Sequence, residues 1–423
     1  MPHSNVRIST SIQNGKLISQ VFDDVATLYD CLRRGARIAK NGPFLGYRRP
    51  PIQKSTPYTW IGYDEVIRKC EMFGRGLVPK FCQPGQQTYV GIYAQNRPEW
   101  IIAEHACYAY SMVIVPIYNT AGLDSVKKVL SETELPIVVI DTMIKLELLI
   151  KNRDCFKKLK LIVVMDDIIP YITPDLIADA RRMKLTILTM KDILKIGENN
   201  SQATASMPPE PSNLAIICYT SGTSGSSRGV LLSHANVVAC FPSLVFLKTM
   251  MFTMDDVFFS YLPAAHCFER GIEQLVMSCG GSIGFFSGSV LLLGDDFFHL
   301  RPTKMPCVPS LINRVYNNSM AKINASKVAK CLFTKAFARK KKLLDMHIIC
   351  DDTIWDYIVF KKIRNYFGGR LKAMVCGSAP ISPEALTFMR IALGCVIVEG
   401  YGLTENTAVA CTLEGDSEPG SDF

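Results

Sequence analysis

One segment of the sequence, Tyr219 to Gly229, combines many hydroxyl side chains with three glycines and one arginine. Backbone N–H groups in such a turn form a concave anion site, and glycines let the backbone approach a ligand closely. Arg228 adds a fixed positive charge. An apolar run precedes the segment, and Ser233 is predicted to begin a helix after it, so the expected context is strand, loop, helix. The segment indicates a polyphosphate site; the alternative is an ordinary Ser/Gly-rich surface loop.

The same loop bears on two other known patterns. It does not match the G-x-x-x-x-G-K-[ST] sequence of a Walker loop. Gly225 to Gly229 does match G-x-S-x-G, the nucleophile elbow of α/β-hydrolases. An elbow serine follows its strand directly, whereas Ser227 follows seven loop residues, and the pattern recurs at Gly280 to Gly284. The hydrolase alternative is therefore the weaker one.

Two further segments offer groups that a nucleotide needs. Residues 375–380, Val-Cys-Gly-Ser-Ala-Pro, are an apolar strand ending in small residues on which a flat ring could lie, although alone they are also typical of a turn. In residues 398–405, Tyr401 can stack, Thr404 can donate to a phosphate oxygen, and Glu405 can hold Mg²⁺, a hard cation. A lone Thr-Glu pair is usually a surface pair, but three such segments in this order rarely arise by chance.

Together these motifs resemble the adenylate-forming (AMP-binding) superfamily. Other stretches, covering about residues 24–420 with the motifs, are similar to the long-chain fatty acid–CoA ligases of animals; they begin at Asn41, Gln95, Ala109, Ser260 and Leu386. The resemblance implies ATP-dependent activation of a long-chain fatty acid to acyl-CoA through an acyl-adenylate, for lipid synthesis or β-oxidation. ATP, Mg²⁺ and coenzyme A as co-substrate are implied with it.

The resemblance also implies roles for individual residues. Residues 220–229 would cradle the β- and γ-phosphates, and His266 would lie near the fatty carboxylate unless it is a satisfied core histidine beside Pro263. The implied catalytic residues are Thr220, Arg228, His266, Thr404 and Glu405, and the implied metal residues are Thr220 and Glu405. The implied nucleotide-binding residues are Thr220, Ser221, Gly222, Thr223, Ser224, Gly225, Arg228, Gly229, Gly377, Ser378, Ala379, Pro380, Glu399, Gly400, Tyr401, Gly402 and Thr404.

The sequence departs from the family in its phosphate loop and at its ends. Residues 223–229 stand where the family has Thr-Thr-Gly-x-Pro-Lys-Gly; Ser keeps a hydroxyl, and Arg keeps the charge but presents a planar fork. We expect an altered rate or affinity. The family's small C-terminal domain and the N-terminal membrane segment of the animal enzymes are expected to be missing. Two alternatives stay open: a truncated, non-catalytic form that binds ATP or fatty acid, and a sister enzyme that adenylates another carboxylate.

The elements that must position these residues follow an alternating pattern. Short apolar runs begin at residues 90, 113, 137, 161 and 214, with helical stretches such as 99–110 and 123–134 between them. This predicts an α/β fold with a mostly parallel sheet and ligands at the carboxyl ends of its strands. The resemblance implies two mostly parallel sheets flanked by helices. The predicted divisions are a lead at 1–23, a first α/β part at 24–199, a linker at 200–212, a second α/β part at 213–412 and an acidic tail at 413–423.

Composition limits the classes of partner. The 423 residues are 48% hydrophobic, which excludes a disordered chain. The net charge of +9 is mild, and the basic clusters at 157–160 and 339–342 lack interleaved stacking aromatics, so nucleic acid is not expected. An anionic membrane surface or an anionic substrate fits as well or better. The 15 cysteines include no C-x-x-C pair and are predicted to be reduced, which indicates an intracellular protein.

Two segments raise the question of a membrane. Residues 275–294 are long enough to span a bilayer, but their glycines and serines favour a buried strand and turn. Residues 326–344 are predicted to form a helix with Phe333 and Phe337 on one stripe, its basic face either solvated or in contact with a membrane. The resemblance implies association with the endoplasmic reticulum, mitochondrial outer membrane or peroxisome in the full-length family form, with the cytosolic face of a membrane as a partner.

Overall fold

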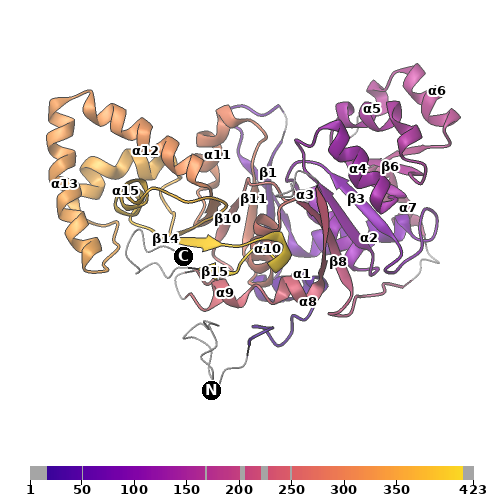
Figure 1. The fold of residues 1–423 in the computed structure, drawn as a ribbon, viewed down its shortest axis with the longest axis horizontal. Coiled ribbons are helices and arrows are strands. Elements are labelled where there is room, and N and C mark those ends of the chain that lie inside the picture. The colour runs from indigo at the N-terminus through magenta and orange to yellow at the C-terminus, as the bar shows by residue number, and fades with distance from the viewer. Residues whose placement is uncertain are drawn as a thin grey trace.

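Two β-sheets with helices packed on them make up the protein (Figure 1). The computed structural model describes residues 17–49, 51–166, 169–200, 205–220, 227–247 and 250–412. Apart from three antiparallel edge pairs, β1–β2, β8–β9 and β14–β15, the strand pairs of the described residues are parallel. The prediction of two mostly parallel sheets flanked by helices is confirmed.

The first sheet has seven strands and the second has eight. In sheet order the first contains β7 (Thr186–Thr189), β6 (Leu161–Val164), β5 (Ile137–Ile140), β3 (Tyr89–Tyr93), β4 (Val113–Ile117), β8 (Leu214–Thr220) and β9 (Arg228–Ser233). The second contains β15 (Cys411–Thr412), β14 (Val396–Tyr401), β13 (Ala373–Cys376), β12 (Lys304–Cys307), β10 (Val257–Ser260), β11 (Ser282–Phe285), β1 (Pro43–Arg48) and β2 (Tyr58–Gly62).

The helices connect successive strands and cover the sheets, as crossovers between parallel strands require. They are α1 (Leu28–Ala39), α2 (Tyr63–Leu77), α3 (Pro98–Tyr108), α4 (Leu123–Thr133), α5 (Met143–Lys151), α6 (Pro174–Arg182), α7 (Met190–Asn199), α8 (His234–Val238), α9 (Pro242–Val245), α10 (Cys267–Ser278), α11 (Leu293–Leu300), α12 (Pro309–Asn324), α13 (Lys327–Asp345), α14 (Lys361–Tyr366) and α15 (Pro383–Leu393). A π-helical turn, η5 (Asp356–Phe360), precedes α14, and a 3₁₀ turn, η6 (Thr404–Asn406), follows β14.

The sheets exchange strands along the chain. β1 and β2, from the first part of the sequence, pair with the second sheet through β11, with Leu45 opposite Ile283. β8 and β9, from the second part, complete the first sheet through β4, with Ile114 opposite Ile216. Each sheet takes strands from both sides of residues 200–212. That these residues are a linker between two parts of the chain stays a prediction.

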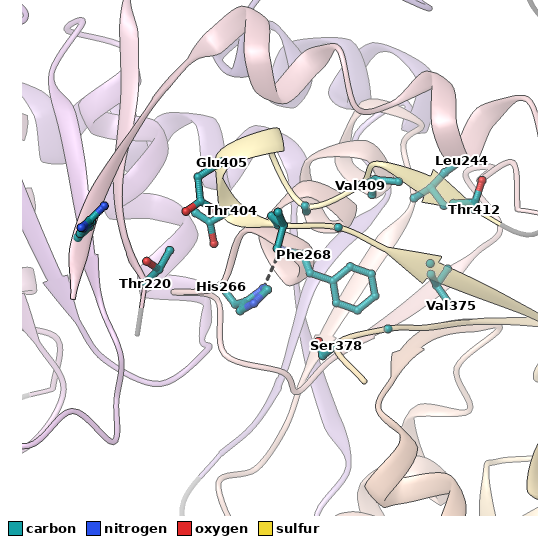
Figure 2. A pocket seen from close by; sticks show the side chains of 16 residues that line it. Thr220, Leu244, His266, Phe268, Val375, Ser378, Thr404, Glu405, Val409 and Thr412 are labelled. Atoms are coloured by element: carbon teal, nitrogen blue, oxygen red, sulfur yellow. Dashed lines mark hydrogen bonds between the residues drawn. The ribbon is translucent and has the colours of Figure 1, made fainter. Parts of the chain in front are cut away.

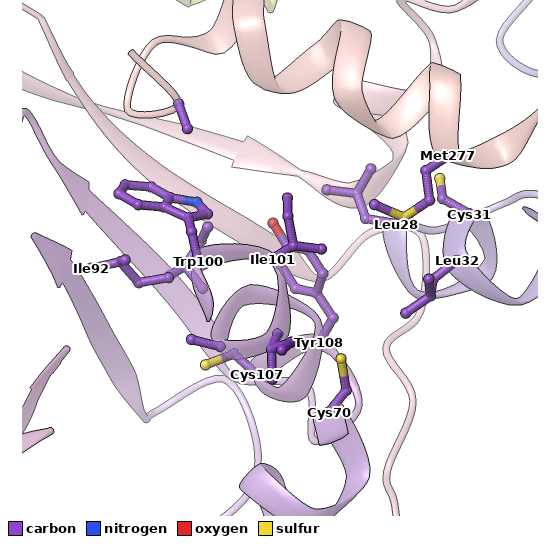
Figure 3. Close-up of a cluster of buried hydrophobic side chains, with 14 of the residues drawn as sticks. Leu28, Cys31, Leu32, Cys70, Ile92, Trp100, Ile101, Cys107, Tyr108 and Met277 are labelled. Carbon is purple, nitrogen blue, oxygen red and sulfur yellow. The ribbon is translucent and has the colours of Figure 1, made fainter. Parts of the chain in front are cut away.

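A buried core joins the two sheets around α3 (Figure 3). Pro98 occupies the first turn of this helix, where its missing N–H costs nothing, and the ten residues other than Glu99 are all buried. Figure 3 shows side chains of α3 facing those of α1, α2, α10 and β3; the labelled ones are Leu28, Cys31, Leu32, Cys70, Ile92, Trp100, Ile101, Cys107, Tyr108 and Met277. A helix that is buried on nearly all sides belongs in such a layer.

One local expectation needs correction, and a second is confirmed with different ends. Residues 228–233 form strand β9, so the Ser/Gly-rich loop joins two antiparallel strands and does not lead directly into a helix. The alternation in this strand buries Leu232, which pairs with Ile216 of β8. The helix predicted to begin at Ser233 is confirmed, since Ser233 is the N-cap residue of α8, which starts at His234. Residues 275–294 contain the end of α10, then β11, then the start of α11, so the predicted strand and turn are found, but with helical ends. None of the helices in the described ranges is long and apolar enough to cross a membrane.

Candidate functional site

Four segments far apart in the sequence form the walls of one cavity of about 340 Å³ (Figure 2). They are the β8–β9 hairpin, the start of α10, the end of β13, and β14 with the turn after it. Nine of the residues predicted for the site line this cavity: Thr220, Arg228, His266, Gly377, Ser378, Gly400, Gly402, Thr404 and Glu405. The carboxyl ends of β8, β13 and β14 therefore meet at one place, as the fold class predicts.

The first wall is the open end of the β8–β9 hairpin. Thr220 pairs with Arg228, and Tyr219 pairs with Gly229, so both strands end at the cavity. Gly229 is in the ladder and is not among the lining residues. Ser221, Gly222, Thr223, Ser224 and Gly225 lie outside the described residues. A hairpin is not the strand-to-helix turn that the hydrolase elbow needs, which removes that alternative.

The second wall is the start of α10, where His266 is the N-cap residue. The backbone N–H of Phe268 donates to Nδ1 of His266 at 3.1 Å, the dashed contact in Figure 2. A ring that accepts at Nδ1 carries its proton on Nε2 when it is neutral. Burial lowers the pKa of His266, and Arg270 lowers it further. The half-buried ring is therefore neutral at pH 7, with an N–H available as a donor.

The segment that leads into His266 is fixed by buried hydrogen bonds. The amide of Asn96 donates to Oγ of Ser260 at 2.8 Å and to the carbonyl of Leu262 at 2.5 Å, and it accepts from the N–H of Ala264 at 2.8 Å. From the other side, the guanidinium of Arg270 donates to the carbonyl of Ala264 at 2.5 Å. These contacts hold residues 260–266 in one path.

The third wall is the end of β13. A β-carbon on Gly377 would lie 3.3 Å from the carbonyl oxygen of Gly400, so the two glycines let neighbouring strands end close together. Ser378 follows with φ of 75°, in the left-handed region, where the chain turns away from the strand. Ala379 and Pro380 are exposed and are not among the lining residues.

The fourth wall is β14 and the turn after it. Thr404 and Glu405 lie in η6 and face the cavity, with Oγ1 of Thr404 3.7 Å from Sγ of Cys267. Figure 2 shows Glu405, Thr404 and Thr220 on the same side of the cavity. Glu399 and Tyr401 lie on β14 outside the lining, with burial raising the pKa of Glu399.

Sequence reasoning missed the apolar part of the lining. It is formed by Leu244, Phe268, Val375, Leu403, Ala408 and Val409, with Thr412 at its edge. Phe268 and Val375 lay inside stretches that were recognised, but nothing in an isolated apolar residue marks it as part of a cavity. Leu244 in α9 carries no motif signal at all.

The charged groups of the cavity are few. Among the residues that the structure describes, Arg228 and Glu405 are the charged ones that line the cavity, and there is no cluster of three His, Cys, Asp or Glu that could hold a metal ion. One carboxylate and one hydroxyl, Glu405 and Thr220, suit an ion such as Mg²⁺ that keeps most of its ligands from phosphate and water. The donors present therefore fit a metal that arrives with a polyphosphate.

The comparison with protein families agrees with this geometry. Residues 45–422 match the family model described as AMP-binding enzyme. The chain belongs to the AMP-binding enzyme family.

Within it, the sequence is similar to mammalian long-chain-fatty-acid–CoA ligases. It is 40% identical to ligase 5 of Rattus norvegicus over 409 residues, which cover 96% of this chain and 58% of that protein. It is 40% identical to ligase 6 of Homo sapiens over 94% of this chain and 56% of the relative, and 38% identical to human ligase 1 over 97% and 58%. The chain thus spans somewhat more than half the length of these relatives.

Solved structures support the fold. The adenylation domain of a carboxylate reductase from Mycobacterium chelonae matches with a TM-score of 0.72 at 22% identity, covering 89% of this chain and 58% of that one. A long-chain-fatty-acid-CoA ligase from Archaeoglobus fulgidus matches with a TM-score of 0.67 at 16% identity, covering 93% and 67%. At these identities the likeness concerns the fold alone.

Proposed function

We propose that this protein takes part in the ATP-dependent activation of long-chain fatty acids to acyl-CoA through an acyl-adenylate. The observation that supports the proposal is the convergence of the three motif segments and His266 on one cavity. Similarity to the mammalian ligases supports the substrate class.

The proposed chemistry has two balanced steps. A carboxylate oxygen of the fatty acid attacks the α-phosphorus of ATP, and the bond to the bridging oxygen of the β-phosphate breaks, so pyrophosphate leaves with the electron pair. The thiolate of coenzyme A then attacks the acyl carbon, and the bond to AMP breaks. Neither step needs a protein nucleophile, so positioning and charge neutralisation supply the catalysis.

Each wall has a part in this proposal. Arg228 neutralises charge on the β- and γ-phosphates together with the loop of residues 220–229, and Thr404 donates to the α-phosphate. The Nε2–H of His266 donates to the fatty carboxylate, which orients the attacking oxygen. Gly377 to Pro380 and Gly400 to Gly402 bracket the adenine, with Tyr401 against its face.

Magnesium would be held by Glu405 and Thr220. When bound with ATP, it would supply positive charge that offsets the charge of the phosphates. The carboxylate of Glu405 is exposed at the cavity and free to approach such an ion.

We further propose that the protein works at the cytosolic face of a membrane, where long-chain fatty acids partition. The family resemblance suggests the endoplasmic reticulum, the mitochondrial outer membrane or the peroxisome. The mild positive charge of the chain is compatible with an anionic surface.

The test is adenylation by the purified 423-residue chain. With palmitate, Mg-ATP and hydroxylamine, we expect pyrophosphate release and palmitoyl hydroxamate. Glu405→Gln should lower this rate at least tenfold and raise the Mg²⁺ concentration needed for half-maximal rate, because it removes the one carboxylate that lines the cavity in the described part of the chain. Glu198→Gln, an equal change on the exposed end of α7, is the matched control.

Three results would overturn the proposal in different ways. Calorimetry that detects no Mg-ATP binding would remove the nucleotide site. Binding without hydroxamate from any carboxylate would favour the non-catalytic form. Hydroxamate formed from benzoate but not palmitate would favour a sister enzyme for another acid.

A further inference from the structure

An excess of positive charge is concentrated in one part of the fold. Residues 322–372, from α12 to the start of β13, contain thirteen Lys or Arg and four Asp or Glu. The difference of nine equals the net charge of the entire chain, +9. Figure 1 places α12 and α13 at one end of the long axis of the molecule, with α5 and α6 at the opposite end.

The acidic groups of this region are mostly paired within it. Asp345 pairs with Lys341 at 2.8 Å, Asp351 pairs with Arg364, and the buried Asp356 pairs with Lys340 at 2.5 Å. Of the remaining cations, Lys372 pairs with Asp256 at 3.8 Å, while the cations of α13 outside these pairs have no carboxylate partner among the described residues.

One face of α13 combines these cations with exposed apolar side chains. Positions three and four apart lie on the same side of a helix, and the solvent side of α13 holds Val328, Cys331, Leu332, Lys335, Arg339 and Lys342. Val328 and Leu332 are 69% and 39% exposed. No carboxylate of the described ranges forms an ion pair with the three cations.

The turn η5, next to α13, also combines exposed apolar side chains with cations. η5 packs on α13 through the buried Lys340–Asp356 pair and the Phe333–Phe360 ring contact at 6.2 Å. Just before and within η5, Ile354, Tyr357 and Ile358 are 66%, 63% and 59% exposed, and the exposed Lys361 and Lys362 follow. Large apolar side chains left in water beside unpaired cations mark an interaction surface.

We propose that the solvent face of α13, with the exposed residues 354–362, is a surface that docks on an anionic lipid membrane. Basic side chains are drawn to the negative surface of such a membrane, and aliphatic and tyrosine side chains enter its headgroup region. Two alternatives fit less well: two copies of this positively charged face repel each other, and Tyr357 is the one aromatic ring among the exposed apolar side chains of this surface, whereas binding of a single-stranded nucleic acid uses several stacked rings. The surface lies on the membrane, since α13 is not apolar enough to span it.

Vesicle sedimentation tests this surface without any assay of activity. The chain should bind vesicles of phosphatidylcholine with 30% phosphatidylserine at low salt, and binding should weaken as salt is added. Each near-surface cation contributes about fivefold, so Lys335→Glu/Arg339→Glu/Lys342→Glu should weaken binding at least about 100-fold. The matched control is Lys157→Glu/Lys158→Glu/Lys160→Glu, an equal charge change on an exposed cluster; along the sequence, the nearest described exposed large apolar side chains are Ile144 and Tyr171, each more than ten positions away.

A probe on the face itself tests insertion. A fluorophore on Cys331, in a variant with Cys155→Ser and Cys411→Ser, should be quenched by brominated lipid; the same fluorophore on Cys155, with Cys331→Ser and Cys411→Ser, should not. Equal binding of both triple variants, equal binding to pure phosphatidylcholine, or unquenched Cys331 would overturn the proposal. So would a dimer in sedimentation velocity that Val328→Ser/Leu332→Ser abolishes, since a second copy would then cover the face. Loss of adenylation with vesicle binding intact would instead count against the proposed function alone.

Discussion

Gly402 lies where the backbone leaves no room for a side chain. A β-carbon there would lie 1.7 Å from the carbonyl oxygen of Ala408. Thr407 and Ala408 have φ of 61° and 82°, so the chain opposite Gly402 already occupies the left-handed region that non-glycine residues rarely adopt. The intervening turn carries Glu405 and Thr404 to the cavity. The absence of a side chain at Gly402 therefore determines where these two groups lie.

We expect Gly402→Ala to weaken Mg-ATP binding at least tenfold in calorimetry, because the added methyl must push the turn open. Forcing a methyl group into a filled space costs about 1–3 kcal/mol, so the free energy of unfolding in urea should fall by that amount. Gly122→Ala is the control, since a β-carbon on this exposed glycine meets no heavy atom within 4 Å. Equal ATP affinity in the two variants would contradict the role given to Gly402.

The motif residues of the site were predictable because each motif combines its functional side chains within a few neighbouring positions of the sequence. The hydroxyls and glycines near Thr220, and the Thr404–Glu405 pair, indicate a phosphate or metal site without any knowledge of the path of the chain. The apolar lining was not predictable, since Leu244 and Val409 meet only through the paths of α9 and the segment after η6. Tyr401 was predicted to stack on adenine; it lies beside the cavity on β14, and that role stays a prediction.

At the scale of elements, the side chain of Asn96 connects the loop after β3 to the segment before α10. Its three hydrogen bonds, at 2.5 to 2.8 Å, reach Ser260, Leu262 and Ala264, and so join the first sheet to the path of His266. Because the ring of His266 is capped onto α10 by the Phe268 N–H, a shift of this segment would move the ring relative to the cavity. Asn96 is a positioning residue in this arrangement.

Asn96→Ala should lower the rate of hydroxamate formation at least tenfold with little change in the KM for ATP, because it displaces His266 while leaving the phosphate-binding walls in place. Gln86→Ala provides a control. Gln86 also makes three hydrogen bonds, one to Ser111 and two to Leu214, but at the end of β8 opposite Thr220. Each variant should lose about 1–3 kcal/mol of unfolding free energy. A similar rate loss in both would show that Asn96 acts through stability alone.

Some helices and strands are indicated by their own local sequence, and others are not. The strands at β3, β4, β5, β6 and β8 and the helices α3, α4 and α13 follow from apolar runs and helical periodicity and are confirmed. The strand β9 was missed because Arg228–Ser233 is polar at both ends, and only its pairing with β8 makes it a strand. Similarly, no local pattern indicates that β1 and β2 cross to the second sheet.

At the scale of the whole molecule, the core between the sheets encloses ionisable groups. His105 of α3 and His234 of α8 are 1% and 0% exposed, and both lie edge-on to Tyr108 at 5.4 and 5.0 Å. Burial lowers the pKa of each histidine to about 3. The buried Glu273 is shifted the other way, with burial raising its pKa to about 8.

These shifts have opposite consequences for stability. A histidine with a lowered pKa binds fewer protons in the folded than in the unfolded state. The protein therefore loses unfolding free energy as the pH falls below about 6.5. A carboxyl with a raised pKa binds more protons folded, so its contribution is lost as the pH rises above about 4.5. The histidine and carboxyl contributions therefore partly cancel in the pH dependence of the unfolding free energy. Comparing a variant with the wild-type protein separates them.

His234→Asn isolates one histidine, because Asn can still accept the N–H of Leu28 that Nδ1 of His234 accepts at 3.2 Å. Between pH 7.5 and 5.5 the wild-type protein should lose about 1.4 kcal/mol more unfolding free energy than this variant, as measured in urea. His347→Asn is the matched control: His347 is exposed, with φ of 60°, which Asn tolerates. A pH dependence that is the same in His234→Asn and wild type would contradict a neutral buried His234.

The exchange of strands between the sheets has a consequence for how the chain is made and cut. During synthesis, the first sheet cannot close until Ser233 has left the ribosome, and β1 waits for β11, more than two hundred residues later. A protease that cuts the exposed stretch at 205–208 produces two fragments, each of which carries strands that belong in the other's sheet. The nicked protein should therefore migrate as one particle until a denaturant separates the fragments.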